Sequence, residues 1–135
     1  KSIMKSNFLK SKLHRISVTN VHLDYEGSCA IDESILKSAN IAEYEMLHIY
    51  NLSNGNRFTT YAIKAEASSG IVSFNGAAAY QAEVGDLVII CTYAELNNDE
   101  IETHKPRLVY FKSKSNIVDQ IKSNIPIQSA IKTVL

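Results

Sequence analysis

The sequence contains few of the residues that mark disulfide-rich, membrane or redox proteins. Its 135 residues include two cysteines and no tryptophan. Cys29 and Cys91 form no CxxC pair, which favours two reduced, buried thiols over a disulfide. No apolar run approaches the roughly 18 residues of a membrane-spanning helix, and the N-terminus lacks the apolar stretch of a secretory signal. The sequence therefore predicts a cytoplasmic protein with no membrane partner.

An excess of charge of one sign is also missing, because 14 basic residues balance 14 acidic ones. This balance argues against a general nucleic-acid or anionic-membrane surface, so we expect no nucleic-acid partner. The apolar share is 45% and the charged share is 21%, as in globular proteins. A chain of this length fits a single domain with a substantial core.

Several motifs with well-defined chemistry are absent from the sequence. It has no P-loop, no dinucleotide-binding fingerprint, no GxSxG elbow and no zinc-spaced cluster. The four histidines are dispersed, and none forms a metal-binding pair by spacing, so we predict no metal. His14 is of interest because it lies two residues from Lys12 and therefore on the same strand face.

Short β-strands separated by turns dominate the sequence. The predicted strands span residues 13–21, 46–52, 57–65, 71–74, 87–93 and 108–111. A short helix is predicted from a cap at Asp32 to Ala39, and Asn54-Gly55 predicts a tight hairpin turn. Segments 42–49 and 82–89 are similar, through either internal duplication or chance. Many short strands with few helices favour a small barrel.

The dipeptide Gly27-Ser28 is the most informative chemical feature. The Ser28 hydroxyl can attack the Gly27 carbonyl and shift the acyl group from nitrogen to oxygen, which replaces the peptide bond with an ester. β-Elimination then releases a carboxylate at Gly27 and leaves a dehydroalanine, which hydrolyses to a pyruvoyl group. Glycine favours the first step because it lacks a Cβ. Taken alone, such a dipeptide is more often an ordinary turn.

Two further segments contain groups that can bind anions. In residues 57–61 the period of two places Arg57 and Tyr61 on one strand face and Thr60 on the other. Arginine and tyrosine together can form a carboxylate fork beside a proton donor, and an exposed strand face is the alternative. Residues 75–79, Asn-Gly-Ala-Ala-Ala, can direct backbone N–H groups at an anion or form a plain turn into a short helix.

Six segments occur in order along the chain: Lys12-Leu13-His14-Arg15, Tyr25-Glu26-Gly27-Ser28-Cys29-Ala30-Ile31-Asp32, Asn54-Gly55, Arg57-Phe58-Thr59-Thr60-Tyr61, Asn75-Gly76-Ala77-Ala78-Ala79 and Gly85-Asp86. Together they resemble the pyruvoyl-dependent aspartate 1-decarboxylases of bacteria. The resemblance runs without large gaps over residues 4–111. It does not extend over residues 112–135, a polar tail that we expect to be partly disordered.

The resemblance implies a mainly β, double-psi β-barrel with short helices. This single domain would span residues 1–112, followed by a C-terminal extension over residues 113–135. It implies a homotetramer with active sites between subunits, and a proenzyme that cleaves itself so that Ser28 becomes the pyruvoyl cofactor, without metal or pyridoxal phosphate. Such enzymes convert L-aspartate to β-alanine and CO₂ for pantothenate and coenzyme A synthesis. The need for a maturation helper is left open.

The resemblance also assigns roles to side chains. The substrate amine forms a Schiff base with the pyruvoyl ketone, and Tyr61 is the proton donor. Arg57 is expected to bind the substrate's side-chain carboxylate, with Lys12 as a second positive charge. The other assignments are Thr60 for polarising the Gly27 carbonyl and contacting substrate, Asn75, Gly76, Ala77 and Ala78 for holding substrate, and His14 and Tyr25 for lining the pocket. Because Thr60 and Tyr61 face opposite ways, either the strand is irregular or the two serve different sites.

Two other functions stay open at this point. A small barrel of this kind can be a binding module without catalysis, and such a module would stay whole on a denaturing gel. A pyruvoyl-dependent decarboxylase of another amino acid is a third interpretation. Arg57 and Lys12 argue against it, because two cations select a substrate with a second carboxylate.

Overall fold

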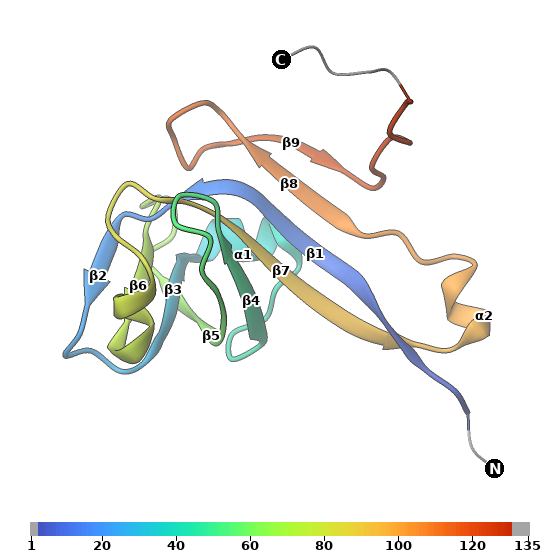
Figure 1. Cartoon of the computed structure of the whole chain (residues 1–135), viewed down its shortest axis with the longest axis horizontal. Coiled ribbons are helices and arrows are strands. Elements are labelled where there is room, and N and C mark those ends of the chain that lie inside the picture. Colours follow the sequence, from blue (N-terminus) through green and yellow to red (C-terminus); the bar gives the residue numbers. More distant parts are fainter. Residues whose placement is uncertain (1–2, 131–135) are drawn as a thin grey trace.

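The computed structural model describes residues 3–130, which are mainly β-strand (Figure 1). The strands are β1 (Ser6–Ser17), β2 (Asn20–His22), β3 (Ser28–Asp32), β4 (Met46–Asn51), β5 (Arg57–Ala65), β6 (Val72–Asn75), β7 (Leu87–Leu96), β8 (Arg107–Phe111) and β9 (Val118–Lys122). Three short helices join them: α1 (Glu33–Ala39), the 3₁₀ helix η1 (Gly76–Gln81) and α2 (Asn98–Ile101). The expected mainly β fold with short helices is confirmed.

The nine strands form one curved sheet in the order β2-β6-β3-β5-β4-β7-β1-β8-β9. Three neighbouring pairs, β1–β8, β3–β5 and β2–β6, run parallel, and the others run antiparallel. Parallel neighbours need crossover connections, so strands far apart in the sequence lie side by side. The similar segments 42–49 and 82–89 each run through a turn into β4 and β7, and these two strands pair with one another.

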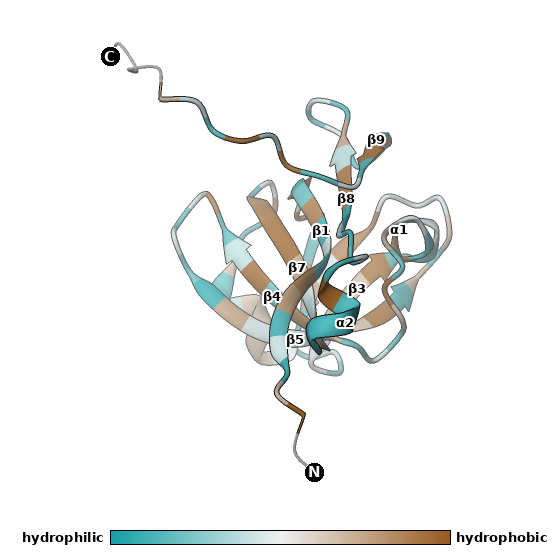
Figure 2. Cartoon of the chain, turned by 90° about the vertical axis from the view of Figure 1, so that its right-hand side faces the viewer, coloured by the Kyte–Doolittle hydropathy of each residue, from teal (hydrophilic) through white to brown (hydrophobic). Residues whose placement is uncertain are grey.

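The curved sheet encloses an apolar core. Alternation along β4 directs Leu47 and Ile49 inward, fully buried, while His48 and Tyr50 lie on the outer face. Figure 2 shows apolar residues concentrated on the strands of the body and hydrophilic residues on α2. Within the described residues, no helix is long and apolar enough to cross a membrane.

Before residue 112, the strands differ most from the sequence prediction in two places. The first strand, expected over residues 13–21, begins at Ser6 and ends at Ser17, and β2 follows separately. Its polar first half carries little strand signal and is ordered by pairing with β7. The second difference is β3, which was not predicted because Ser28-Cys29-Ala30 has weak β-propensity. Burial between β5 and β6 makes it a strand, so Ser28 lies at a strand start.

The chain beyond residue 112 contributes one strand to the sheet. β9 pairs antiparallel with β8 at the end of the sheet, which the sequence did not predict. The preceding turn is tied to the body by Asn116, whose Nδ2 donates to the carbonyls of Ser17 and Gly70. Residues 123–130 are exposed and form no regular structure. The expected disorder falls partly on residues 131–135, which lie outside the described part of the chain.

Asp32 anchors the far end of β3. Its carboxylate caps α1 and accepts from Ser34 N and Oγ, at 2.8 and 2.6 Å, and from the N–H groups of Ser68 and Gly70, at 2.9 and 2.8 Å. Burial raises the pKa of Asp32, but the hydrogen bonds from Ser34, Gly70 and Ser68 outweigh it and hold the pKa below its ordinary value. One ionised group thus joins β3, α1 and the turn after β5.

Asp32→Asn should destabilise the protein by about 1.5–3 kcal/mol at neutral pH, because an amide cannot accept all of these bonds. The lowered pKa means that the stabilisation is fully present above the ordinary value of 3.8 and is lost as pH falls through the lower folded-state value. In urea unfolding, the difference in the free energy of unfolding between wild type and variant should therefore become smaller at acid pH. Asp119→Asn, at an exposed position of β9, is the control. A gap that stays constant under acid would contradict the assignment.

Candidate active site

A cavity of about 410 Å³ opens at the start of β3, where Ser28 is only 1% exposed. We call it the Ser28 cavity. Its lining residues are Gly27, Ser28, Phe58, Thr59, Thr60, Tyr61, Asn75, Ala77, Ala78 and Gln81. Of the candidate residues named from the sequence, seven therefore line one cavity.

Thr60 and Tyr61 both reach the Ser28 cavity although they alternate on β5. The pairing of β5 with β4 over residues 57–61 is continuous, so the strand is not irregular here. β5 pairs with β3 only from Ala62, which lies opposite Cys29. The edge of β5 before Ala62 is therefore open on the side of Ser28, and groups from both strand faces can line the same cavity at an open edge. Thr60 and Tyr61 can therefore line one site although their side chains belong to opposite faces of a regular strand.

Asn75 is the polar neighbour of Ser28. It ends β6 and lies opposite Ser28 in the antiparallel register. Its Nδ2 donates to Ser28 Oγ over a long 3.5 Å, while its Oδ1 accepts from Ser73 Oγ at 2.8 Å. Ser28 Oγ in turn donates to the carbonyl of Glu26 at 3.1 Å, a bond that spans Gly27. The hydroxyl is thus held against the peptide that the sequence marks for cleavage.

Gly76 approaches the chain at Gly27 more closely than any side chain would allow. A Cβ at Gly76 would lie 2.7 Å from Gly27 Cα, 3.1 Å from Gly27 N and 3.4 Å from the carbonyl of Tyr25. Gly76 also has a φ of +65°, in the left-handed region that glycine adopts readily. The start of η1 is therefore packed backbone to backbone against the segment before Ser28.

Arg57 and Lys12 lie on the outer face of the sheet and do not line the Ser28 cavity. Lys12 lies opposite Cys91 in the pairing of β1 with β7. Burial raises the pKa of the Cys91 thiol, whereas a hydrogen bond with Tyr93 and the charges of Lys12 and Arg57 lower it. Both cations therefore lie close to Cys91. We call Lys12, Arg57 and Cys91, with their aromatic neighbours Tyr50 and Tyr93, the cationic face.

His14 and Tyr25 also lie outside the Ser28 cavity. His14 lines a second cavity with Arg15 and Tyr110, and its Nδ1 is buried without a partner among the described residues. Burial lowers the pKa of His14, and the charges of Lys12 and Arg15 lower it further. The side chain of Tyr25 is exposed and stacks on the His22 ring, with the ring centroids 4.3 Å apart.

Sequence reasoning missed three residues that support these groups. Ser73 orients the Asn75 amide, and its signal was the period of two that places both side chains on one face of β6. Tyr50 and Tyr93 were missed on the cationic face. A two-residue turn at Asn54-Gly55 would set Leu52 opposite Arg57. The observed loop between β4 and β5 is longer and brings Tyr50 opposite Arg57, so this contact was not available from the sequence. Within residues 3–130, His, Cys, Asp and Glu side chains form no group of three that could hold a metal.

Comparison with known proteins gives a consistent result. The sequence profile described as aspartate decarboxylase matches residues 4–118. A protein of Methylobacillus flagellatus named aspartate 1-decarboxylase is 55% identical over 127 residues, which cover 94% of this chain and 100% of the relative. Proteins of the same name from Hydrogenovibrio crunogenus and Nitrosococcus oceani are 55% and 54% identical and cover 93% and 94% of this chain, and 96% and 100% of the relatives. With this similarity spread over nearly its whole length, the chain belongs to the aspartate decarboxylase family.

Proposed function

We propose that this protein is a lyase that decarboxylates L-aspartate at the α-carboxylate to give β-alanine and CO₂, for pantothenate and coenzyme A synthesis. The names of its relatives support this reaction. The observation that carries the proposal is the buried Ser28 hydroxyl, held across Gly27 beside a cavity that contains a hydroxyl, a phenol and an amide. The two free, buried cysteines support a cytoplasmic location.

The first proposed step is self-cleavage between Gly27 and Ser28. Ser28 Oγ attacks the Gly27 carbonyl carbon, and the acyl group moves from the amide nitrogen to the oxygen. Elimination across the Ser28 Cα–Cβ bond expels the Gly27 carboxylate, and hydrolysis of the resulting dehydroalanine releases ammonia. Thr60 lines the same cavity, and its hydroxyl is suited to stabilising the oxyanion of the first step.

The residues around Ser28 fit a pyruvoyl group formed from it. The backbones of Gly27 and Gly76 lie so close that a Cβ at Gly76 would not fit, and the small side chains of Ala77 and Ala78 line the adjoining cavity. The pyruvoyl group supplies an electron sink for the pair left when CO₂ departs. Ala77 and Ala78 leave room for substrate beside their backbone amides, and Asn75 offers a donor next to Ser28. Tyr61, on the open side of the cavity, is placed to return a proton to the substrate's Cα.

Gly76→Ala should slow self-cleavage by about 10- to 100-fold, because the new Cβ must displace the Gly27 backbone. Gly55→Ala is a matched control: its φ of +80° imposes similar strain, but nothing lies within 4 Å of the new Cβ. Denaturing gels and intact mass on purified protein should show wild type and Gly55→Ala as a 27-residue fragment ending at Gly27 and the remaining 108 of 135 residues. Normal cleavage of Gly76→Ala would mean that the close approach is irrelevant to processing.

Thr60→Val and Tyr61→Phe should separate making the cofactor from using it. Thr60→Val keeps the shape but removes the oxyanion donor, which typically costs about 2.7–4 kcal/mol of barrier, so the uncut chain should accumulate. Tyr61→Phe should cleave normally and fail at turnover. Borohydride reduction with labelled aspartate should still label its 108-residue fragment. If Tyr61→Phe blocks cleavage while Thr60→Val cleaves normally, the two assignments are reversed.

Aspartate carries a second carboxylate, and the cations suited to it lie on the cationic face, outside the Ser28 cavity. We propose that the enzyme is a homotetramer in which the cationic face of one copy meets the Ser28 cavity of its neighbour. Arg57 would then bind the carboxylate that is kept in the product, with Lys12 as a second positive charge. The proposed assembly would bring the cations of one copy to the Ser28 cavity of another, which lie apart within a single chain.

Complementation tests this arrangement. Ser28→Ala should remain an uncut, inactive chain, and Arg57→Ala should be cleaved but turn over aspartate poorly. Co-expressed in equal amounts, they should form hybrid tetramers in which about a quarter of the sites combine an intact Ser28 with an intact neighbouring Arg57. Aspartate turnover should then exceed that of either variant alone. Mixed tetramers with no gain in activity would show that Arg57 does not complete a neighbour's site.

A further inference from the structure

Arg57 rests on an aromatic ring on the cationic face. Its guanidinium carbon lies 4.0 Å from the centroid of the Tyr50 ring, its register partner across the β4–β5 hairpin. Within residues 3–130, Arg57 forms no salt bridge, whereas Lys10 is paired with Glu45. The ring therefore orients the guanidinium through its flat face, and the N–H donors around its edge stay available for a carboxylate.

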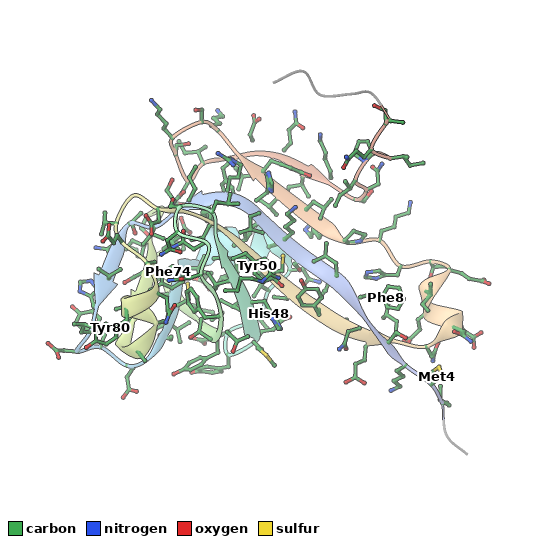
Figure 3. All side chains as sticks on the ribbon, viewed as in Figure 1. Met4, Phe8, His48, Tyr50, Phe74 and Tyr80 are labelled. Atoms are coloured by element: carbon green, nitrogen blue, oxygen red, sulfur yellow. The ribbon has the colours of Figure 1, made fainter. Side chains whose placement is uncertain are left out.

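Tyr50 is itself held in place by Tyr93. The two phenol oxygens are 2.7 Å apart, and the Tyr93 ring packs edge-on against His48 with centroids 4.9 Å apart. Figure 3 shows Tyr50 and His48 along the same strand, β4. Burial raises the pKa of Tyr93, and the hydrogen bond with Tyr50 raises it further. Tyr93 consequently keeps its proton at neutral pH, so its phenol is uncharged.

We propose that Tyr50, held by its hydrogen bond with Tyr93, is the positioning residue that sets the orientation of Arg57 toward the substrate's side-chain carboxylate. This inference rests on the proposed role of Arg57 in aspartate binding. Neither tyrosine lines the Ser28 cavity of its own chain, and Arg57 lies between the substrate's carboxylate and the Tyr50 ring in the proposed arrangement. The tyrosine pair acts on affinity for dicarboxylate substrates and leaves the chemical step unchanged.

The test separates the ring from the hydroxyl. Tyr50→Leu removes the ring and should raise the KM for aspartate by about 5- to 10-fold. Tyr50→Phe keeps the ring but loses the bond to Tyr93, as does Tyr93→Phe, and each should raise KM by about threefold. The double Phe variant should match either single variant, because both remove the same bond. Throughout, kcat and the extent of self-cleavage should stay close to wild type.

Two controls exclude a general structural effect. Tyr44→Phe removes a phenol at an exposed position and should leave KM unchanged. L-alanine lacks the side-chain carboxylate. In the absence of aspartate, wild-type and Tyr50→Leu enzyme should bind it with equal affinity. A weakened affinity for L-alanine in Tyr50→Leu would mean that the whole site is disturbed, and would overturn the proposal.

Arg57→Ala distinguishes substrate binding by Arg57 from the positioning of Arg57 by the tyrosines. If it raises the KM for aspartate while Tyr50→Leu and both Phe variants leave KM unchanged, Arg57 binds substrate without help from the tyrosines, and the positioning proposal is wrong. If Arg57→Ala itself leaves KM unchanged, the proposed role of Arg57 falls and the positioning role falls with it. If Tyr50→Leu has no further effect in the Arg57→Ala background, the tyrosine acts through Arg57, as proposed.

Discussion

The contact between Gly76 and Gly27 is the constraint on which the organisation around Ser28 depends. It joins the start of η1 to the segment before β3 with no space for a Cβ between them. Because η1 follows β6, the same contact sets Ala77 and Ala78 beside the cavity and brings Asn75 opposite Ser28. A backbone-to-backbone contact this close is stiff, since neither segment can move aside at small cost. The hydroxyl and the peptide beside it are therefore presented in a single arrangement.

The positive charges lie apart from this region. Lys12 lies opposite Cys91 on the outer face of the sheet, the charge of Arg57 acts on the same thiol, and Arg57 rests on Tyr50. Separation keeps Arg57 solvated and available, because burying an unpaired guanidinium beside Ser28 would carry a large desolvation penalty. An ionised substrate that bridges the two regions would neutralise the cations as it binds. The proposed assembly therefore links substrate recognition to contact between copies.

Much of this organisation follows from local patterns. The glycine-serine pair, the position of the Asn54-Gly55 turn and the strand face shared by Arg57 and Tyr61 are each readable over a few residues. The strand β3 was not readable, because its small residues have weak strand propensity and only burial between β5 and β6 orders them. The first half of β1 is likewise too polar to be recognised, and pairing with β7 orders it.

The sequence by itself determined the chemistry available at Gly27-Ser28 and the residue types placed on each strand face. Only the tertiary structure decided which of them meet. Thr60 and Tyr61 share one cavity because β3 pairs with β5 only from Ala62 onward. Arg57 is separated from Ser28 because the hairpin register sets it over Tyr50. Periodicity fixes a face over a few residues, whereas strand order and register depend on pairings between segments far apart in the chain, which local patterns do not encode.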